Sequence, residues 1–360
     1  MSTTPTSSSA AATRSVPVID ISGWASGDPE ARSAIVDAVR EAATTYGFMQ
    51  ITGHGVPHDL IADMLAVNDE FFALPTAVKE ALVSPPEVNR GYSGIGAESL
   101  AYSLGVEAPP DIFESFNIAR DTVDETDPAV MAERHRFLAP NVWPDEAMPS
   151  MRPRLNAYYD AVAELARTVT RIFAVALDMP EDFFVQRCRH PIEVMRMIRY
   201  ERQPGSPDPI EGQQRMGAHT DYGIVTVLYA DKVAGLEIVG PDGEWWPVVP
   251  ADGAYIINLG DLLAEWTNDH WRSTIHRVSP PPPRVEGPAL RRSTAFFLDG
   301  DYDMVVECLP SCCSEDDPPK YAPITGGDHL LEKLGGSRGL VAATDSTDTV
   351  KERMATVTDG

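Results

Sequence analysis

The chain has 360 residues, of which 43% are hydrophobic and 23% charged, and such a chain is long enough to bury a sizeable core. This composition excludes a disulfide miniprotein, a collagen and a wholly disordered chain. Lys and Arg number 29 against 54 Asp and Glu, so the formal net charge is -25 and the surface repels phosphate backbones and anionic lipid. We therefore expect neither nucleic acid nor a membrane surface as a partner.

Cysteine usage and hydropathy indicate the compartment. Three of the four cysteines, Cys308, Cys312 and Cys313, share one segment, and no second cysteine pair completes a zinc site. Free thiols are typical of a reducing compartment. No run approaches the ~18 apolar residues of a membrane helix, and the N-terminus lacks the apolar core of a signal peptide. We expect a cytoplasmic protein.

The first half of the chain alternates short strands and helices. The Ser/Thr/Ala-rich residues 1–14 are predicted to be a disordered tail, followed by a strand at Val16 to Ile19. Helical spacing predicts a helix from Pro29 to Tyr46, and Phe48 to Ile51 returns as a strand. A second helix opens at Pro57. Its apolar stripe consists of Ile61, Met64, Val67 and Phe71.

The longest predicted helix has one apolar face for six turns and ends before Pro180. Its stripe consists of Leu155, Tyr158, Val162, Leu165, Val169, Ile172 and Ala176. From Val194 onward short β-rich runs follow one another between Gly, Pro, Asp and Asn clusters, which predicts an antiparallel sandwich or barrel. Four consecutive prolines from Pro280 cannot lie in a central strand, so Ser279 to Leu290 is predicted to be a loop.

Two motifs offer metal ligands. His219-Thr220-Asp221 opens a β-rich run, where residues i and i+2 point to the same face of a strand. His276 adds a second imidazole directly before the proline-rich loop. Two histidines and one carboxylate occupy one face of a metal ion and leave the other face open, which suits ferrous iron. The same three ligands also bind catalytic zinc in hydrolases, but the sequence shows no candidate general base at a suitable spacing from them.

A second cluster offers donors to a carboxylate. Arg291 and Ser293 share one face of a predicted strand, and an Arg grips a carboxylate bidentately. Tyr200 can supply a third donor. Taken singly, each of these residues is equally compatible with a purely structural role.

The order of the motifs along the chain points to a family. HTD is followed by NLGD from Asn258, WTNDHWRSTIHRV from Trp266, and RRSTAFF from Arg291. The first half adds VPVIDIS, YGFMQITGHGVP, FFALP and NRGYSG. Over nearly the whole chain, this set resembles the isopenicillin N synthase-like branch of the 2-oxoglutarate- and Fe(II)-dependent dioxygenases.

The resemblance implies a fold that is mainly β with flanking helices, built on a distorted double-stranded β-helix or jelly roll. It implies an N-terminal α/β region at 15–130 and a helix plus jelly-roll catalytic domain at 131–340, with a C-terminal tail at 341–360. By motif position, His219, Asp221 and His276 would ligate the iron. Arg291 and Ser293, assisted by Tyr200, would bind the distal carboxylate of 2-oxoglutarate.

The activity that the resemblance implies is oxidation of a small molecule, such as an amino-acid-derived or secondary metabolite. Fe(II) would be the cofactor, 2-oxoglutarate and O2 the co-substrates, and succinate and CO2 the by-products. Hydroxylation is the default outcome, with desaturation or ring closure set by pocket geometry. Two alternatives stay open, a 2-oxoglutarate-independent ferrous oxidase of the isopenicillin N synthase type and a non-catalytic jelly-roll binding protein. The sequence leaves the oligomeric state open.

Four residues are candidates for substrate contact. Arg90 and Tyr92 lie in the NRGYSG motif, and Phe116 lies in a run that borders the active site in this family. Strand alternation from Ser293 points Phe297 inward. Core packing of the phenylalanines and a solvent-exposed Arg90 are the structural alternatives.

Overall fold

A computed structural model describes residues 14–85, 88–101, 108–201, 210–280 and 290–337. The two predicted tails, apart from Arg14, and residues 281–289 of the predicted loop lie outside these ranges. No helix within them is both long enough and apolar enough to cross a membrane.

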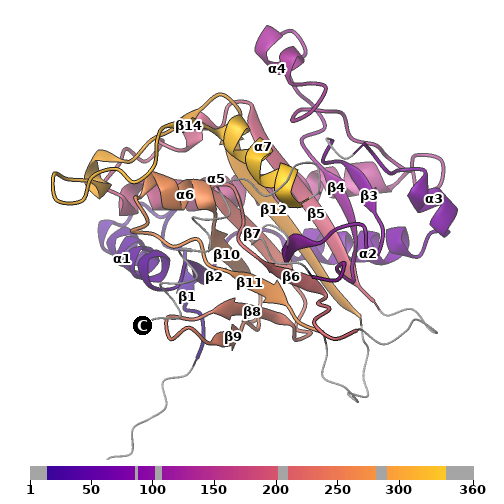
Figure 1. The fold of residues 1–360 in the computed structure, drawn as a ribbon, viewed down its shortest axis with the longest axis horizontal. Coiled ribbons are helices and arrows are strands. Elements are labelled where there is room, and N and C mark those ends of the chain that lie inside the picture. Colours follow the sequence, from indigo (N-terminus) through magenta and orange to yellow (C-terminus); the bar gives the residue numbers. More distant parts are fainter. Residues whose placement is uncertain (1–13, 86–87, 102–107, 202–209, 281–289, 338–360) are drawn as a thin grey trace, which may run out of the picture.

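A large sheet of eight strands forms the centre of the molecule (Figure 1). Its strands are β1 (Val18–Asp20), β2 (Phe48–Thr52), β3 (Gly91–Ser93), β4 (Glu114–Ile118), β5 (Pro191–Tyr200), β7 (Val225–Ala230), β10 (Tyr255–Leu259) and β12 (Arg291–Asp301). Their order is β1-β2-β10-β7-β12-β5-β4-β3, and only the pair β1 and β2 is parallel. The sheet thus takes strands from both predicted regions, 15–130 and 131–340.

A smaller antiparallel sheet has the order β6-β11-β8-β9. These strands are β6 (Met216–His219), β8 (Leu236–Val239), β9 (Trp245–Pro247) and β11 (His276–Val278), and a separate pair joins β13 (Val305–Val306) to β14 (Ile324–Thr325). The predicted antiparallel sandwich is confirmed by these two main sheets. The jelly-roll class of the fold is shown by the comparisons with solved structures described below.

The helices are α1 (Pro29–Thr45), α2 (His58–Phe72), α3 (Thr76–Glu80), α4 (Pro128–Ala132), α5 (Met151–Ala176), α6 (Asp261–Trp266) and α7 (Gly326–Ser337). The helix predicted from Pro29 is confirmed, and the Asp28 side chain caps it by accepting a hydrogen bond from the backbone N–H of Glu30. The second helix begins one residue later than predicted, with Pro57 as its cap residue. The long helix ends where Asp178 adopts a left-handed φ of 59°, two residues before Pro180.

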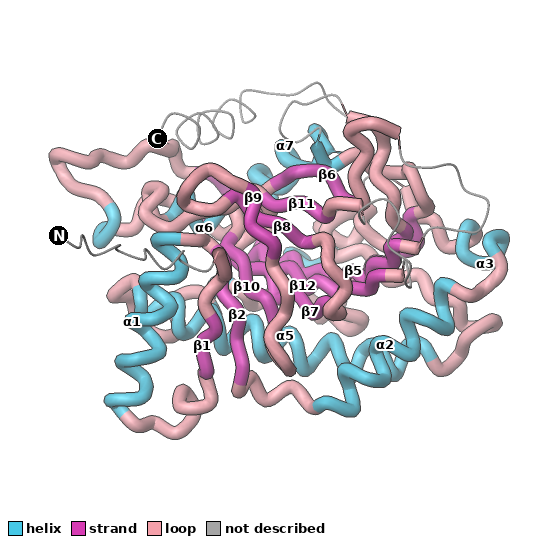
Figure 2. Tube along the Cα trace, turned by 90° about the horizontal axis from the view of Figure 1, so that it is seen from below, coloured by secondary structure: helices cyan, strands magenta, loops and turns pink. Residues whose placement is uncertain are grey.

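The large sheet is buried on both faces. Helices α1, α2 and α5 pack against one face, and the smaller sheet lies against the other (Figure 2). On β10, Tyr255 and Ile257 join the core under the helices, whereas Ile256 joins the core between the sheets. This alternation gives each central strand one face for the helix core and one for the space between the sheets, where the functional site lies.

Candidate active site

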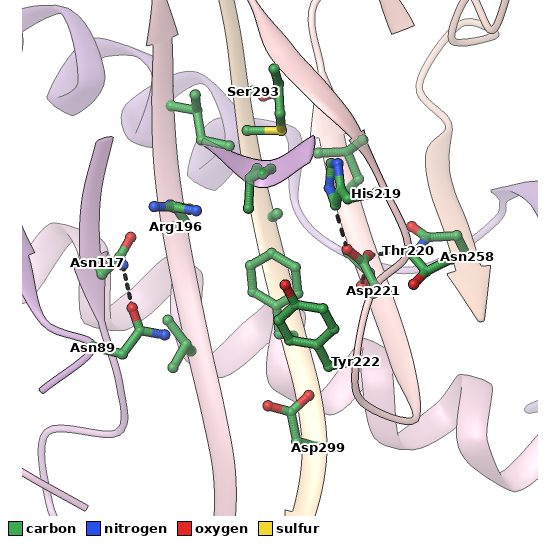
Figure 3. A pocket seen from close by; sticks show the side chains of 18 of the residues that line it. Asn89, Asn117, Arg196, His219, Thr220, Asp221, Tyr222, Asn258, Ser293 and Asp299 are labelled. Atoms are coloured by element: carbon green, nitrogen blue, oxygen red, sulfur yellow. Dashed lines mark hydrogen bonds and ion pairs between the residues drawn. The ribbon is translucent and has the colours of Figure 1, made fainter. Parts of the chain in front are cut away.

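A cavity of about 420 Å³ lies between the two sheets (Figure 3). Residues of both sheets and of α7 form its walls. Most of the wall surface is apolar, with Phe48, Ile198, Leu228, Leu236 and Phe297 among its residues, and polar side chains make up about half of the lining residues. A concave, mostly apolar space with a few convergent polar groups is typical of a small-molecule site.

The three predicted metal ligands meet in the wall of this cavity. His219, Asp221 and His276 each offer one ligand atom, and these atoms all lie within 4.8 Å of one another. The Nε2 atoms of His219 and His276 lie 3.8 Å and 3.7 Å from the same oxygen, Oδ1 of Asp221. All three side chains are buried. A single ion can therefore be bound by all three residues.

Backbone carbonyls orient the two imidazoles. Nδ1 of His219 lies 2.7 Å from the carbonyl oxygen of Gly217, and Nδ1 of His276 lies 3.1 Å from that of Thr274. Because a carbonyl oxygen only accepts, the proton of each neutral ring is on Nδ1 and the lone pair on Nε2 faces the cluster. Burial and, to a lesser degree, the nearby His276 lower the pKa of His219 to about 4, so the ring is neutral and ready to ligate at pH 7.

Asp221 is oriented by two side chains of the large sheet. Its Oδ2 accepts hydrogen bonds from the Thr226 hydroxyl and, at 2.6 Å, from the Asn258 amide, which leaves Oδ1 directed at the histidines. The predicted strand geometry of the HxD triplet is wrong. His219 is the last residue of β6 and Asp221 lies in the loop that follows, so the hydrogen bonds, and not the strand pleat, bring the carboxylate to the imidazole.

Arg291, Ser293 and Tyr200 form a second polar cluster in the same cavity. The Arg291 guanidinium is 5.0 Å from the centroid of the Tyr200 ring and 3.4 Å from the Ser293 hydroxyl. Its Nε is buried, and within the described ranges it has no hydrogen-bond partner. Burial raises the pKa of the Tyr200 hydroxyl, which therefore remains a protonated donor. A buried cation with an unused donor beside two hydroxyls fits the carboxylate of 2-oxoglutarate.

The four predicted substrate contacts fall into two groups. Arg90 and Phe297 line the cavity. Arg90 donates from Nε, Nη1 and Nη2 to the backbone carbonyls of Ala139, Asn89 and Phe137, so it also holds the cavity wall together. Tyr92 and Phe116 lie instead in the core under the helices.

Strand parity explains the position of Tyr92 and Phe116. Tyr92 pairs with Phe116 across β3 and β4, and the ring centroids of Phe116 and of Phe71 in α2 are 4.5 Å apart. The Tyr92 hydroxyl donates to Glu114. The cavity side of β4 is taken by Asn117, one residue further along, which the sequence analysis did not select. The geometry therefore gives no support to substrate contact by Tyr92 or Phe116.

Three further residues of the site escaped the sequence analysis. Asn258 lies in the NLGD motif. The motif was recognised from its position along the chain, but the hydrogen bond from Asn258 to Asp221 was not predicted. Thr226 carries no local signal, because its role depends on where the preceding loop turns. Asp299 lines the cavity with Ser293, Ala295 and Phe297 of β12, but it lies at a break in the pairing of β12 with β5, which strand alternation in the sequence does not reveal.

Two sheets that enclose a cavity with two histidines and one carboxylate define the class of mononuclear non-haem iron enzymes. Two family profiles match the chain. Residues 16–146 match the non-haem dioxygenase in morphine synthesis N-terminal family, and residues 186–300 match the 2OG-Fe(II) oxygenase superfamily.

Curated relatives and solved structures agree with these matches. The chain is 36% identical over 331 residues to the 2-oxoglutarate-Fe(II) type oxidoreductase hxnY of Emericella nidulans, covering 91% of each chain. It is 34% identical to the 2-oxoglutarate-dependent dioxygenase citB of Monascus ruber, covering 88% of this chain and 94% of that one. The crystal structure of a full-length Neurospora crassa protein in complex with alpha-KG and thymine superposes with a TM-score of 0.77 at 28% identity, covering 89% of this chain and 96% of that one.

The chain belongs to the isopenicillin N synthase-like 2OG-Fe(II) oxygenase superfamily. It is an oxidoreductase that depends on Fe(II), 2-oxoglutarate and O2, and its core is the jelly roll of this superfamily. The relatives are named as 2-oxoglutarate-dependent enzymes, which favours this activity over the 2-oxoglutarate-independent oxidase and over the non-catalytic binding protein.

Proposed function

We propose that this enzyme oxidises a small molecule inside the cavity between the two sheets, with His219, Asp221 and His276 as the iron ligands and Arg291 as the anchor of 2-oxoglutarate. The main support for the proposal is that these groups converge on one cavity. The ligand atoms of the three residues lie within 4.8 Å of one another, and within the described ranges the buried Nε of Arg291 has no hydrogen-bond partner.

Each residue has a defined task in this proposal. His219 and His276 present Nε2 lone pairs because their Nδ1 protons are held by backbone carbonyls. Arg291 neutralises the distal carboxylate of 2-oxoglutarate, and Ser293 and Tyr200 offer hydroxyl donors beside it. When bound, the iron couples reduction of O2 to oxidative decarboxylation of 2-oxoglutarate, which yields succinate, CO2 and an oxidised substrate.

The substrate is a small molecule whose body contacts apolar side chains. The cavity of about 420 Å³ falls in the size range of small-molecule sites, and its wall is largely apolar. The thymine bound in the Neurospora crassa structure supports a small substrate. Hydroxylation is the default outcome, because desaturation or ring closure requires the activated carbon to be held away from the incoming oxygen. The cytoplasmic location and the absence of nucleic-acid and membrane partners stay predictions.

The first test needs no substrate. Purified apoprotein receives Fe(II) and 2-oxoglutarate without oxygen, and the visible spectrum is recorded for the weak metal-to-ligand charge-transfer band of the chelated complex. We expect a band that requires both components and is lost in His219→Ala. His270→Ala is the matched control, because this exposed histidine pairs with Asp317 outside the cluster, and it should keep the band.

The outcomes separate the readings. Iron binding without a band would overturn the role of 2-oxoglutarate as a chelating co-substrate. A band that survives in His219→Ala would overturn the ligand assignment.

A further inference from the structure

Asp299 is a buried carboxylate that the assigned roles do not use. It lies on β12 two residues beyond Phe297, lines the cavity and is 8% exposed. Within the described ranges, no hydrogen bond or ion pair joins its carboxylate to another residue. Figure 3 draws Asp299 in the wall of the same cavity as His219 and Asp221. A buried acceptor without a partner is costly, so its position calls for a ligand.

Two features of the backbone direct this carboxylate. β12 pairs Leu298 with Glu193 and Gly300 with Ile192, so Asp299 is the extra residue of a β-bulge. Such bulges re-aim side chains and are enriched beside active sites. Gly223 makes room on the neighbouring loop, because a Cβ at this position would overlap the Asp299 carboxylate. The carboxylate is therefore built into the cavity wall.

The surroundings favour a positively charged partner. The adjacent cavity residues on β5 and β12, Ile192, Val194 and Phe297, are apolar. The two acidic groups that act on Asp299 are Asp221 and Glu193, and together with burial, the largest cause, they raise its pKa to about 7. Burial in an apolar wall penalises an unpaired carboxylate, and a protonated amine that donates hydrogen bonds to it would offset this penalty.

The arginines in the cavity wall have other partners. Arg196 forms an ion pair with Glu98, and Arg136 forms one with Glu133. Arg291 lies near Tyr200 and Ser293, the cluster assigned to 2-oxoglutarate. Arg90, the fourth arginine of the wall, donates to three backbone carbonyls. Among the described residues of the wall, none of these four arginines pairs with Asp299, so a positive partner would come from the molecule that enters the cavity.

We propose that Asp299 selects substrates that carry a basic nitrogen, by accepting hydrogen bonds from the protonated amine while the apolar wall contacts the rest of the molecule. This inference rests on the proposed function, because it assumes that substrate occupies the cavity beside the iron. It names a substrate class, small cationic amines, and a specificity residue at the opposite end of β12 from Arg291.

The experiment measures binding at pH 8, above the raised pKa of Asp299, to the anaerobic enzyme loaded with Fe(II) and 2-oxoglutarate. Calorimetric titration compares benzylamine, 2-phenylethylamine and piperidine with their neutral counterparts benzyl alcohol, 2-phenylethanol and tetrahydropyran. We expect at least one amine to bind about 10- to 100-fold more tightly than its counterpart, the range of a charge-assisted hydrogen bond. Asp299→Asn keeps the shape of the side chain and should abolish this preference.

Controls distinguish the outcomes. Asp303→Asn removes the same charge from an exposed position four residues away and should keep the preference for amines. Asp299→Asn should keep the charge-transfer band of the Fe(II) and 2-oxoglutarate complex, which shows that the fold and the iron site are intact. Failure of the wild-type enzyme to form the band contradicts the proposed function. Formation of the band with no amine bound at millimolar concentration, or with an equal preference in Asp299→Asn, overturns the role of Asp299 alone.

Discussion

Thr226 and Asn258 hold the Asp221 carboxylate from two neighbouring strands. Thr226→Val removes one of these donors without changing the size of the side chain, so Asp221 loses part of its orientation. Partners of metal ligands typically contribute 10- to 100-fold to affinity, and we expect Fe(II) to bind about 10-fold more weakly. Anaerobic titration calorimetry measures the change. Thr294→Val is the control, because Thr294 faces Met64 of α2 on the other side of the sheet, and equal losses in both variants would contradict the role of Thr226.

Arg291 and Arg292 are adjacent on β12 but point to opposite faces. Arg291→Ala removes the buried cation beside Ser293, and we expect the apparent KM for 2-oxoglutarate to rise about 100-fold because a bidentate charged contact is lost. Arg292→Ala breaks a partly exposed pair with Asp69 and should leave this KM within about twofold. Succinate formation at varied 2-oxoglutarate concentration gives both values, and an unchanged KM in Arg291→Ala would rule out the anchor.

The raised pKa of Asp299 makes the stability of the apoprotein depend on pH. In the unfolded chain the carboxyl ionises near pH 4, whereas in the folded protein it keeps its proton until about pH 7. Stability is therefore lost as pH rises through this window and is not regained above it. Asp299→Asn lacks this loss, so it should be more stable than the wild type at pH 8, by up to about 4 kcal/mol, but not at pH 4. Urea unfolding at both pH values measures the difference, and a gap that does not grow with pH would contradict the buried state of Asp299.

Within the strand β12, alternate residues face two environments, the core under the helices and the cavity. Phe296 is fully buried, and its ring centroid lies 5.2 Å from that of Tyr159 in α5, whereas Phe297 lines the cavity. Phe296→Ala should cost about 3 to 5 kcal/mol of unfolding free energy, because a cavity is left in a close-packed core. Phe297→Ala should cost much less and should alter which small molecules stimulate succinate formation. Thermal unfolding of the two variants measures the contrast, and equal losses of stability would show that β12 does not alternate between the two environments.

The same alternation decides how far the elements could be predicted. Helices α1, α2 and α5 were predicted because their apolar stripes repeat at helical spacing, and β12 was predicted from its β-branched and aromatic run. β4 was not predicted as a strand, since its buried residues Ser115 and Asn117 hide the apolar pattern. The position of Asp221 depends on a loop and on partners remote in sequence, so periodicity cannot give it. Tyr92 and Phe116 show that a motif can place residues near the site without showing which face of their strands meets the cavity.

At the scale of the whole molecule, the net charge of -25 acts on every ligand that approaches. 2-Oxoglutarate is a dianion, so its encounter with the enzyme is slowed when the charge is unscreened. Raising the ionic strength from about 10 mM to about 150 mM shortens the screening length from roughly 30 Å to roughly 8 Å, and the association rate constant should rise. Stopped-flow recording of the charge-transfer band measures it. A rate that falls with added salt would show that the arginines of the cavity dominate the field.

The two-sided burial of the large sheet also bears on how such an enzyme acquires new substrates. Ala295, Phe297 and Asp299 share the cavity face of β12, while the residues between them belong to the core under the helices. Mutations at these three positions alter what fits in the cavity and spare both the helix packing and the iron ligands. Over generations the oxidative chemistry and the choice of substrate can therefore diverge separately, and a combinatorial library confined to this one strand face is the direct laboratory counterpart of that process.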